Sequence, residues 1–272
     1  MTYCVSCCML PFGLLQDTGP GDDRIRPPSP RTYSNQYADV FAVFHNQASL
    51  ARIRTFSAGA YASRRFMLRA TTGMAFAAAL PVSSGTFAVS ASRFGYEVFN
   101  HHEASVAYGR HLGRYVDIGM QFDYLSTRIQ EYGSAHAVTA EAGIAVHPAS
   151  WLQVGLHAFS PAPVHYSKPV NEDIGSRYTL GLGFEPSDKI LLALEGSWDT
   201  QSGTFLSLSF AYQPAPVLAI CSGFTTGTRQ NFLGVRLFLK RLRIDMSTGY
   251  HPRLGITPAL GVVYHIPARQ PK

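Results

Sequence analysis

The sequence lacks the features of a helical membrane protein and has few of those of a typical soluble domain. No run of the ~18 apolar residues that a transmembrane helix requires is present. Only 15% of the 272 residues are charged, against a usual share of ~25%. The 19 Arg and 4 Lys are scattered along the chain, which argues against a nucleic-acid surface. Glycine and aromatic residues are plentiful instead, with 24 Gly, 17 Phe and 14 Tyr.

Metal and cofactor chemistry also has little support. Three of the four cysteines (Cys4, Cys7 and Cys8) lie at the start of the chain, and the fourth, Cys221, is far from them. This spacing matches no cysteine-based metal site. No G-x-S-x-G motif marks a nucleophilic serine. The sequence therefore predicts neither a bound metal nor a cofactor.

What the sequence does contain, from about residue 54 onward, is a series of alternating runs. In "TFLSLSFAY", Leu206, Leu208 and Phe210 share one face, with serine and alanine on the other. The ending "LGITPALGVVYHI", residues 254–266, repeats the pattern. A period of two indicates β-strands whose two faces meet different environments. The second face is mostly Gly, Ala, Ser and Thr, which suits the narrow interior of a barrel; a soluble β-sandwich with a polar outer face is the alternative.

These runs number about fourteen, and each has about the 9–11 residues that a tilted strand needs to cross a bilayer. The expected strands are 54–62, 65–80, 84–96, 101–113, 114–130, 134–147, 151–160, 174–186, 188–199, 202–213, 216–226, 229–241, 242–251 and 254–266. Tight turns such as 186–188 alternate with longer connections, of which 160–174 is the longest. We predict an all-β fold, a transmembrane antiparallel β-barrel of about 14 strands.

Charged side chains inside the expected strands fall on the face opposite the large apolar residues. A lipid-facing Arg or Lys near the bilayer centre costs ~2–4 kcal/mol, so these charges are expected in the lumen. The lumen candidates are Asp117, Asp123, Glu141, Glu195, Arg236 and Arg243, and Arg69 and Asp245 share their phase. Two interpretations are open: a network across the lumen that closes the pore, or ion pairs that only fill and stiffen the interior.

The first fifth of the chain does not alternate. Residues 1–33 are expected to be a disordered tail or a degenerate signal region, because their apolar stretch lacks a basic residue before it and a clear cleavage site after it. Residues 34–53 are expected to fold into the barrel as a short plug-like segment. His45, Asn46 and Gln47 are the plug candidates, with a polar turn bonded to its own backbone as the alternative. Residues 54–266 form the barrel, and residues 267–272 form a C-terminal tail.

Two groups of polar residues raise the question of enzymatic chemistry. His157 precedes Ser160 by three residues, but no carboxylate lies near in the sequence to orient the histidine. His101, His102 and Glu103 suggest a metal ligand set, but adjacent histidines on a strand point to opposite faces, so a loop tip is the plainer interpretation. We therefore predict no catalytic residues and no metal site.

The plug-like segment resembles the segment before the barrel in the long-chain fatty-acid transporter (FadL) superfamily, which reads like D-A-s-t-v-f-x-N-P-A-g-l-A. Here Ala38-Asp39-Val40-Phe41 is followed by "HNQASLA" at 45–51, in which Gln47 replaces the proline and Ser49 the glycine. "HNQASLA" is more similar to the PorV/PorQ-like branch, as are stretches 107–124, 154–164 and 249–266. The "PARQPK" after Ile266 departs from the family, whose barrels end on or near a terminal aromatic residue.

The resemblance implies a fourteen-stranded barrel of the bacterial outer membrane with an N-terminal plug. It implies either passage of hydrophobic small molecules or a part in type IX secretion. Expected partners are outer-membrane lipid and either hydrophobic compounds or secretion-system proteins, with no nucleic acid. A scaffold barrel without an open pore is the alternative function, and an outer-membrane acyl hydrolase has less support.

Overall fold

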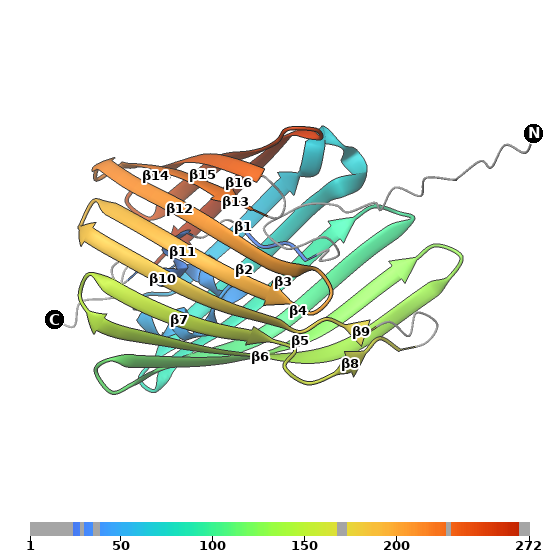
Figure 1. Cartoon of the computed structure of the whole chain (residues 1–272), viewed down its shortest axis with the longest axis horizontal. Coiled ribbons are helices and arrows are strands. Elements are labelled where there is room, and N and C mark those ends of the chain that lie inside the picture. Colours follow the sequence, from blue (N-terminus) through green and yellow to red (C-terminus); the bar gives the residue numbers. More distant parts are fainter. Residues whose placement is uncertain (1–23, 28–29, 35–38, 168–172, 227–229, 267–272) are drawn as a thin grey trace, which may run out of the picture.

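Fourteen antiparallel strands close into a barrel (Figure 1). The computed structural model describes residues 24–27, 30–34, 39–167, 173–226 and 230–266. The barrel strands are β1 Ser57–Arg64, β2 Thr72–Val82, β3 Gly85–Gly95, β4 Phe99–Leu112, β5 Val116–Ile129, β6 Gly133–Ala149, β7 Leu152–Phe159, β10 Arg177–Ser187, β11 Ile190–Asp199, β12 Gly203–Ala215, β13 Leu218–Thr225, β14 Gln230–Phe238, β15 Leu242–His251 and β16 Gly255–His265. β1 pairs with β16 and closes the barrel. The predicted fold class and strand number are confirmed.

One expected strand begins too early. Residues 65–71 were assigned to the strand 65–80, but they form two short 3-10 turns, η4 (Arg65–Met67) and η5 (Arg69–Thr71). Phe66 and Met67 have positive φ values of 53° and 61°, which interrupt an extended chain. Arg69 is consequently exposed on η5, and its expected place on the lumen face is wrong.

The two faces of the barrel wall have the predicted character. Leu208 is 53% exposed and Phe122 58% exposed on the outer face, whereas Asp117 and Asp123 are each 1% exposed on the inner face. Aromatic pairs lie near both rims: Tyr178 stacks on Trp198 near one, and Trp151 meets Phe184 edge to face near the other. An apolar outer band between aromatic girdles is typical of a barrel that spans a bilayer.

The rims differ in their connections. The rim where β1 begins and β16 ends has only tight turns, such as residues 83–84, 150–151 and 188–189. The opposite rim, called here the loop rim, holds the longer connections, including η4 with η5. The connection between β7 and β10 is the longest and carries the small hairpin β8 (Val164–His165) and β9 (Asp173–Ile174).

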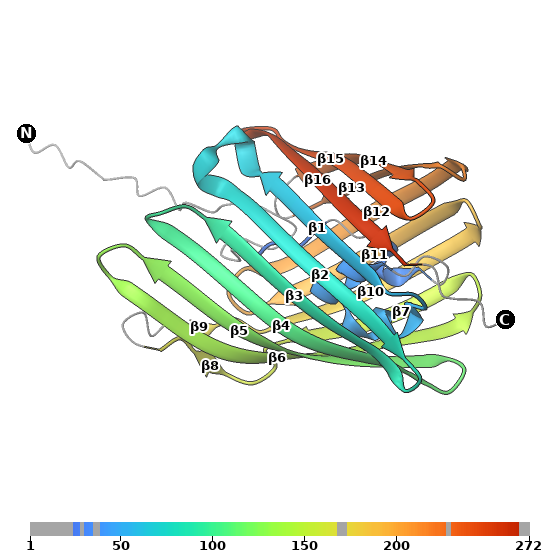
Figure 2. The same cartoon turned by 180° about the vertical axis from the view of Figure 1, so that it is seen from behind.

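The described residues that precede β1, from 24 onward, lie inside the barrel (Figure 2). It forms three 3-10 turns: η1 (Pro30–Tyr33), η2 (Val40–Phe44) and η3 (Gln47–Arg52). Residues 24–27 are buried as well, with Ile25 at 0% exposure, so this part of the expected tail 1–33 belongs to the interior. No helix in the described ranges is long and apolar enough to span a membrane.

Several expectations concern residues outside the described ranges. These are the remaining tail 1–23 with Cys4, Cys7 and Cys8, residues 28–29, the motif residue Ala38, and the C-terminal tail 267–272.

Candidate functional site

The candidate site is the contact between the barrel wall and the lumen segment, defined as the described residues 24–27, 30–34 and 39–53. One side of this segment is apolar: Phe41, Val43, Leu50 and Ile53 belong to one buried cluster. The wall residues in that cluster are Tyr61, Ala75, Ala77, Ala79, Ala88, Phe94, Ala107 and Val263. The alanine-rich inner face of β1–β4 and β16 therefore receives the apolar side of the lumen segment.

Asn46 both shapes the segment and ties it to the wall. Its Oδ1 accepts a hydrogen bond from the Ala48 N–H at 3.0 Å, which caps η3. Its Nδ2 donates to the carbonyl of Leu156 on β7 at 3.2 Å. The side chain is 0% exposed, so both bonds are shielded from water. The backbone-bonded turn expected as an alternative is present, and it is joined to the wall as well.

A row of glycines brings η3 close to the wall. Gly109, Gly119 and Gly143 face one another across β4, β5 and β6. A Cβ on Gly119 would lie 2.3 Å from the carbonyl carbon of Gln47, and one on Gly143 would lie 2.1 Å from Asn46 Oδ1. Real Cβ atoms do not approach other atoms this closely, so the segment fits only because these wall positions carry no side chain.

A second glycine pair receives η1. Tyr33, at the end of η1, is 3% exposed. Cβ atoms on Gly181 and Gly183 of β10 would lie 2.0 Å from Tyr33 Cζ and 1.8 Å from the Tyr33 carbonyl oxygen. The glycines of the strand "YTLGLGFE" thus have a specific role in seating an aromatic ring within the lumen.

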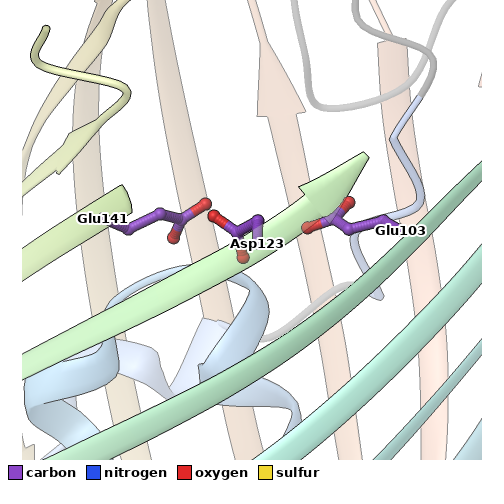
Figure 3. Close-up of side chains that lie close together, drawn as sticks. All are labelled: Glu103, Asp123 and Glu141. Atoms are coloured by element: carbon purple, nitrogen blue, oxygen red, sulfur yellow. The ribbon is translucent and has the colours of Figure 1, made fainter. Parts of the chain in front are cut away.

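Three groups of polar contacts between the lumen segment and the wall include charge candidates, and the first surrounds a cluster of carboxylates. Glu103, Asp123 and Glu141 come from the neighbouring strands β4, β5 and β6, and Figure 3 shows their carboxylates directed toward one another. Gln47 Nε2 donates to Glu141, to the Val43 carbonyl at 3.1 Å and to Gln121 at 3.4 Å. Gln47 therefore links η3 to β5 and β6.

Positive charge reaches this cluster from the N-terminal end of the lumen segment. The Arg24 guanidinium lies 3.6 Å from Glu141 and stacks over the Phe159 ring at 3.5 Å from its centroid. His157 Nε2 lies 3.0 Å from the same Glu141 carboxylate. The three carboxylates offer oxygens within 4.8 Å of one another, which is the spacing of a hard-cation site. Arg24 already supplies a cation beside this cluster.

The second group ties η2 to β14 and β15. Asp39 caps η2 by accepting from the Phe41 N–H at 3.2 Å. It also pairs with Arg243 at 2.7 Å, and Arg243 pairs with Asp245 at 2.8 Å. Arg236 lies 3.4 Å from Asp245. Burial raises the pKa of Asp39, but the adjacent Arg243 and Arg236 lower it by more, so the pKa lies below its usual range.

The third group lies near the tight-turn rim. Arg52, the last residue of η3, donates through Nε to Asp117 at 3.0 Å. His147 Nε2 lies 2.7 Å from the same carboxylate, and His111 contacts its other oxygen. Asp117 is 1% exposed, so the arginine of the lumen segment neutralises a buried charge of the wall.

Five of the six lumen charge candidates fall into these three groups, each centred on a different residue of the lumen segment. The sixth, Glu195, is half-buried and accepts from Ser197 Oγ at 3.4 Å. Of the plug candidates, His45 contacts the segment itself: its Nε2 lies 2.7 Å from the Pro27 carbonyl.

Sequence reasoning missed the partners of these charges. Arg24, Asp39 and Arg52 lie on the lumen segment, and Glu103 was considered only beside its histidines. Asp39 carries a usable signal, since an aspartate directly before an apolar run marks an N-cap. Arg24 carries none, because it stands in a proline-rich stretch that reads as disordered.

The residues considered for enzymatic chemistry have other roles. His157 does have a carboxylate partner, Glu141, although none lies near it in the sequence. Ser160 Oγ donates to the Ala162 carbonyl at 3.3 Å. His101 and His102 point to opposite faces as expected, but they lie within β4 and not at a loop tip.

Comparison with known proteins gives a consistent fold. No protein-family model and no curated protein matches the sequence. The CymD monoaromatic hydrocarbon channel superposes with a TM-score of 0.65 at 9% identity, over 85% of this chain and 94% of that one. A Pseudomonas aeruginosa FadL homologue gives 0.60 at 11% identity, over 85% and 94%. The Pseudomonas putida toluene transporter TodX gives 0.61 at 12% identity, over 86% and 95%.

These identities are low, so the likeness concerns the fold. It extends over nearly the whole length of each neighbour, and two of the three named above are described as a channel and a transporter. The chain has the fold of the FadL- and TodX-type barrels for hydrophobic compounds.

Proposed function

We propose that this protein is a bacterial outer-membrane barrel that passes small hydrophobic compounds, and that the lumen segment is the plug that closes it. The observation that carries the proposal is the way the segment is held. It lies inside the barrel and is joined to the wall by non-covalent contacts, among them those of Gln47 with Glu141, Asp39 with Arg243 and Arg52 with Asp117. A segment held in this way can change position without unfolding the barrel.

A small cavity lies beside the lumen segment. A cavity lined by Phe41, Tyr61, Cys221 and Phe232 has a volume of about 20 Å³, which is room for about one water. In this proposal the docked lumen segment is the closed state. The wall of β1–β4 and β16 that faces the segment is alanine-rich and carries aromatic side chains, and such surfaces favour an apolar solute over a sugar or an ion.

The proposal is tested by deleting residues 39–52 and measuring uptake of toluene and arabinose by proteoliposomes. The deletion should leave a barrel that still shifts its gel mobility on heating, with raised uptake. Shortening the β7–β10 connection, which lies at the loop rim, is the matched control and should leave uptake unchanged. An assembled deletion variant with wild-type uptake would instead support a scaffold barrel without a pore.

A part in type IX secretion is the second candidate, and it rests only on the sequence resemblance to the PorV/PorQ-like branch. The contacts described above concern closure of a lumen and favour transport. Co-purification of secretion-system proteins with the full-length barrel, lost on removal of the β8–β9 connection, would favour the second candidate.

A further inference from the structure

The outer wall of the barrel is hollowed around β1 and β2. A groove of about 530 Å³ lies over β1–β4 and β16. Ala60 and Ala62 of β1 and Ala91 of β3 form the floor of the groove, beside the larger side chains of Phe76 and Leu260. Its volume falls within the ~300–1,000 Å³ of small-molecule sites, and its lining is almost wholly apolar.

Strand register places basic groups at one end of this groove. Leu260, Ala62, Met74, Arg93 and His102 face one another in a single row across five strands. Arg93 and His102 line the groove and are exposed on the outer wall. This row lies toward the loop rim, because Arg93 is two residues from the end of β3.

Two further arginines stand at the same end. Arg64 follows Ala62 by two residues, so it continues the same outer face of β1 to the loop rim. Arg69 is exposed on η5, which contacts β3. Glu97, in the connection after β3, is the acidic residue exposed nearby. Positive charge therefore predominates at the mouth of an apolar groove.

We propose that this groove binds one anionic phospholipid, with an acyl chain over the alanines and the headgroup phosphate at Arg93 and Arg64. The proposal rests on the proposed position of the barrel in a membrane, and it adds a specific lipid site to that function. Arginine binds phosphate through its planar set of N–H donors. A neutral partner would leave these arginines without a counter-charge at the edge of the bilayer.

The site is tested by lipid retention. The barrel is reconstituted in vesicles of phosphatidylcholine that contain about one tenth phosphatidylglycerol and is then extracted in mild detergent. Native mass spectrometry identifies and counts the lipids that remain bound. Wild type should retain one phosphatidylglycerol in preference to phosphatidylcholine. Arg93→Gln should lower this retention about fivefold, the factor that corresponds to ~1 kcal/mol per basic residue near an anionic surface.

Matched variants separate a groove from general attraction. Arg110→Gln removes an outward arginine of β4 near the tight-turn rim, and it should retain phosphatidylglycerol as wild type does. Ala62→Leu fills the groove and should abolish retention, whereas Ala142→Leu, on the outer face of β6, should not. Equal retention of the two lipids by wild type, or equal effects of Arg93→Gln and Arg110→Gln, would overturn the site.

The pore and the lipid site are read by different measurements. The groove variants should keep their heat-modifiable mobility and their wild-type toluene uptake. A wild-type barrel that has normal mobility and toluene uptake but no lipid preference refutes the groove alone, whereas a wild-type protein that fails to insert into vesicles refutes the barrel as well.

Discussion

Gly119→Ala should open the closed barrel by displacing η3. The glycine lies in the middle of the row on β4–β6, and its added Cβ would stand 2.3 Å from the Gln47 carbonyl carbon and 2.4 Å from the Ala48 nitrogen. Both are backbone atoms, so no side-chain rotation relieves the contact. Ordinary contacts lie at about 3.5–4.0 Å, and η3 must therefore move by more than an ångström or the strand must bend.

The size of the effect follows from the cost of overpacking. An extra methyl group in a well-packed interior costs ~1–3 kcal/mol. If this cost acts only on the docked state, the ratio of undocked to docked barrels rises ~5–150-fold. Displacement of η3 also moves Asn46, whose bond to the Leu156 carbonyl is lost with it. We therefore expect the ratio of undocked to docked barrels to rise by a factor in the upper half of this range.

Toluene and arabinose uptake by proteoliposomes measures this ratio, with heat-modifiable mobility as the check on assembly. Gly261→Ala is the matched control, because this glycine of β16 also faces the lumen but its added Cβ would meet nothing closer than 3.4 Å, the side chain of Asp245. Wild-type uptake in an assembled Gly119→Ala barrel would show that the glycine row does not govern closure.

Three further predictions concern charges. Arg52→Gln should raise uptake ~10-fold or more, since a hydrogen bond to a buried charge is worth ~1.5–3 kcal/mol, whereas Arg54→Gln, at an exposed position, should not. Equal uptake in the two variants would contradict the role of the Arg52–Asp117 pair. Leu208→Arg should impair assembly by ~2–4 kcal/mol through lipid exposure, and the lumen-side Ser209→Arg should assemble better; folded yields that do not differ would reverse the facing of β12. The pKa of Asp39 is lowered in the docked state, so docking is favoured above the ordinary carboxyl pKa of ~4 and weakens as pH falls below it. Uptake should therefore rise in acid, and Asp39→Asn should flatten that rise. A rise of undiminished size in the variant would show that another group causes the pH dependence.

The barrel was predictable because strand alternation is a local property. The apolar phase of residues 254–266, for example, is set by neighbours two positions apart, and the membrane on one face forces it to persist. The prediction was wrong at residues 65–71, where a positive φ at Phe66 decides the structure and no residue type signals it.

The site was predictable only in part, because its contacts join residues far apart in sequence. Gln47 and Glu141 are separated by 94 positions and Ser34 and Glu185 by 151. Each residue had a recognisable type, but no spacing rule relates a plug to a wall. The glycines of β5 and β10 were read as small interior residues, which is true, yet their role in seating Gln47 and Tyr33 depends on where a separate segment lies.

The lumen segment has two unlike sides, and this bears on what can open the pore. On the side of β5, β6 and β15, undocking separates Arg52, Gln47 and Asp39 from buried charged or polar partners, and each loss leaves a polar group to be solvated. On the side of β1–β3 and β16, undocking separates mainly apolar surfaces, together with one hydrogen bond from Thr86 Oγ1 to the Ile53 carbonyl at 3.4 Å. A hydrophobic solute can replace Phe41 against alanine there without leaving an unpaired polar group, whereas a sugar cannot. We therefore expect the intact barrel to admit toluene far more readily than arabinose, and the deletion of residues 39–52 to reduce that selectivity as it raises both fluxes.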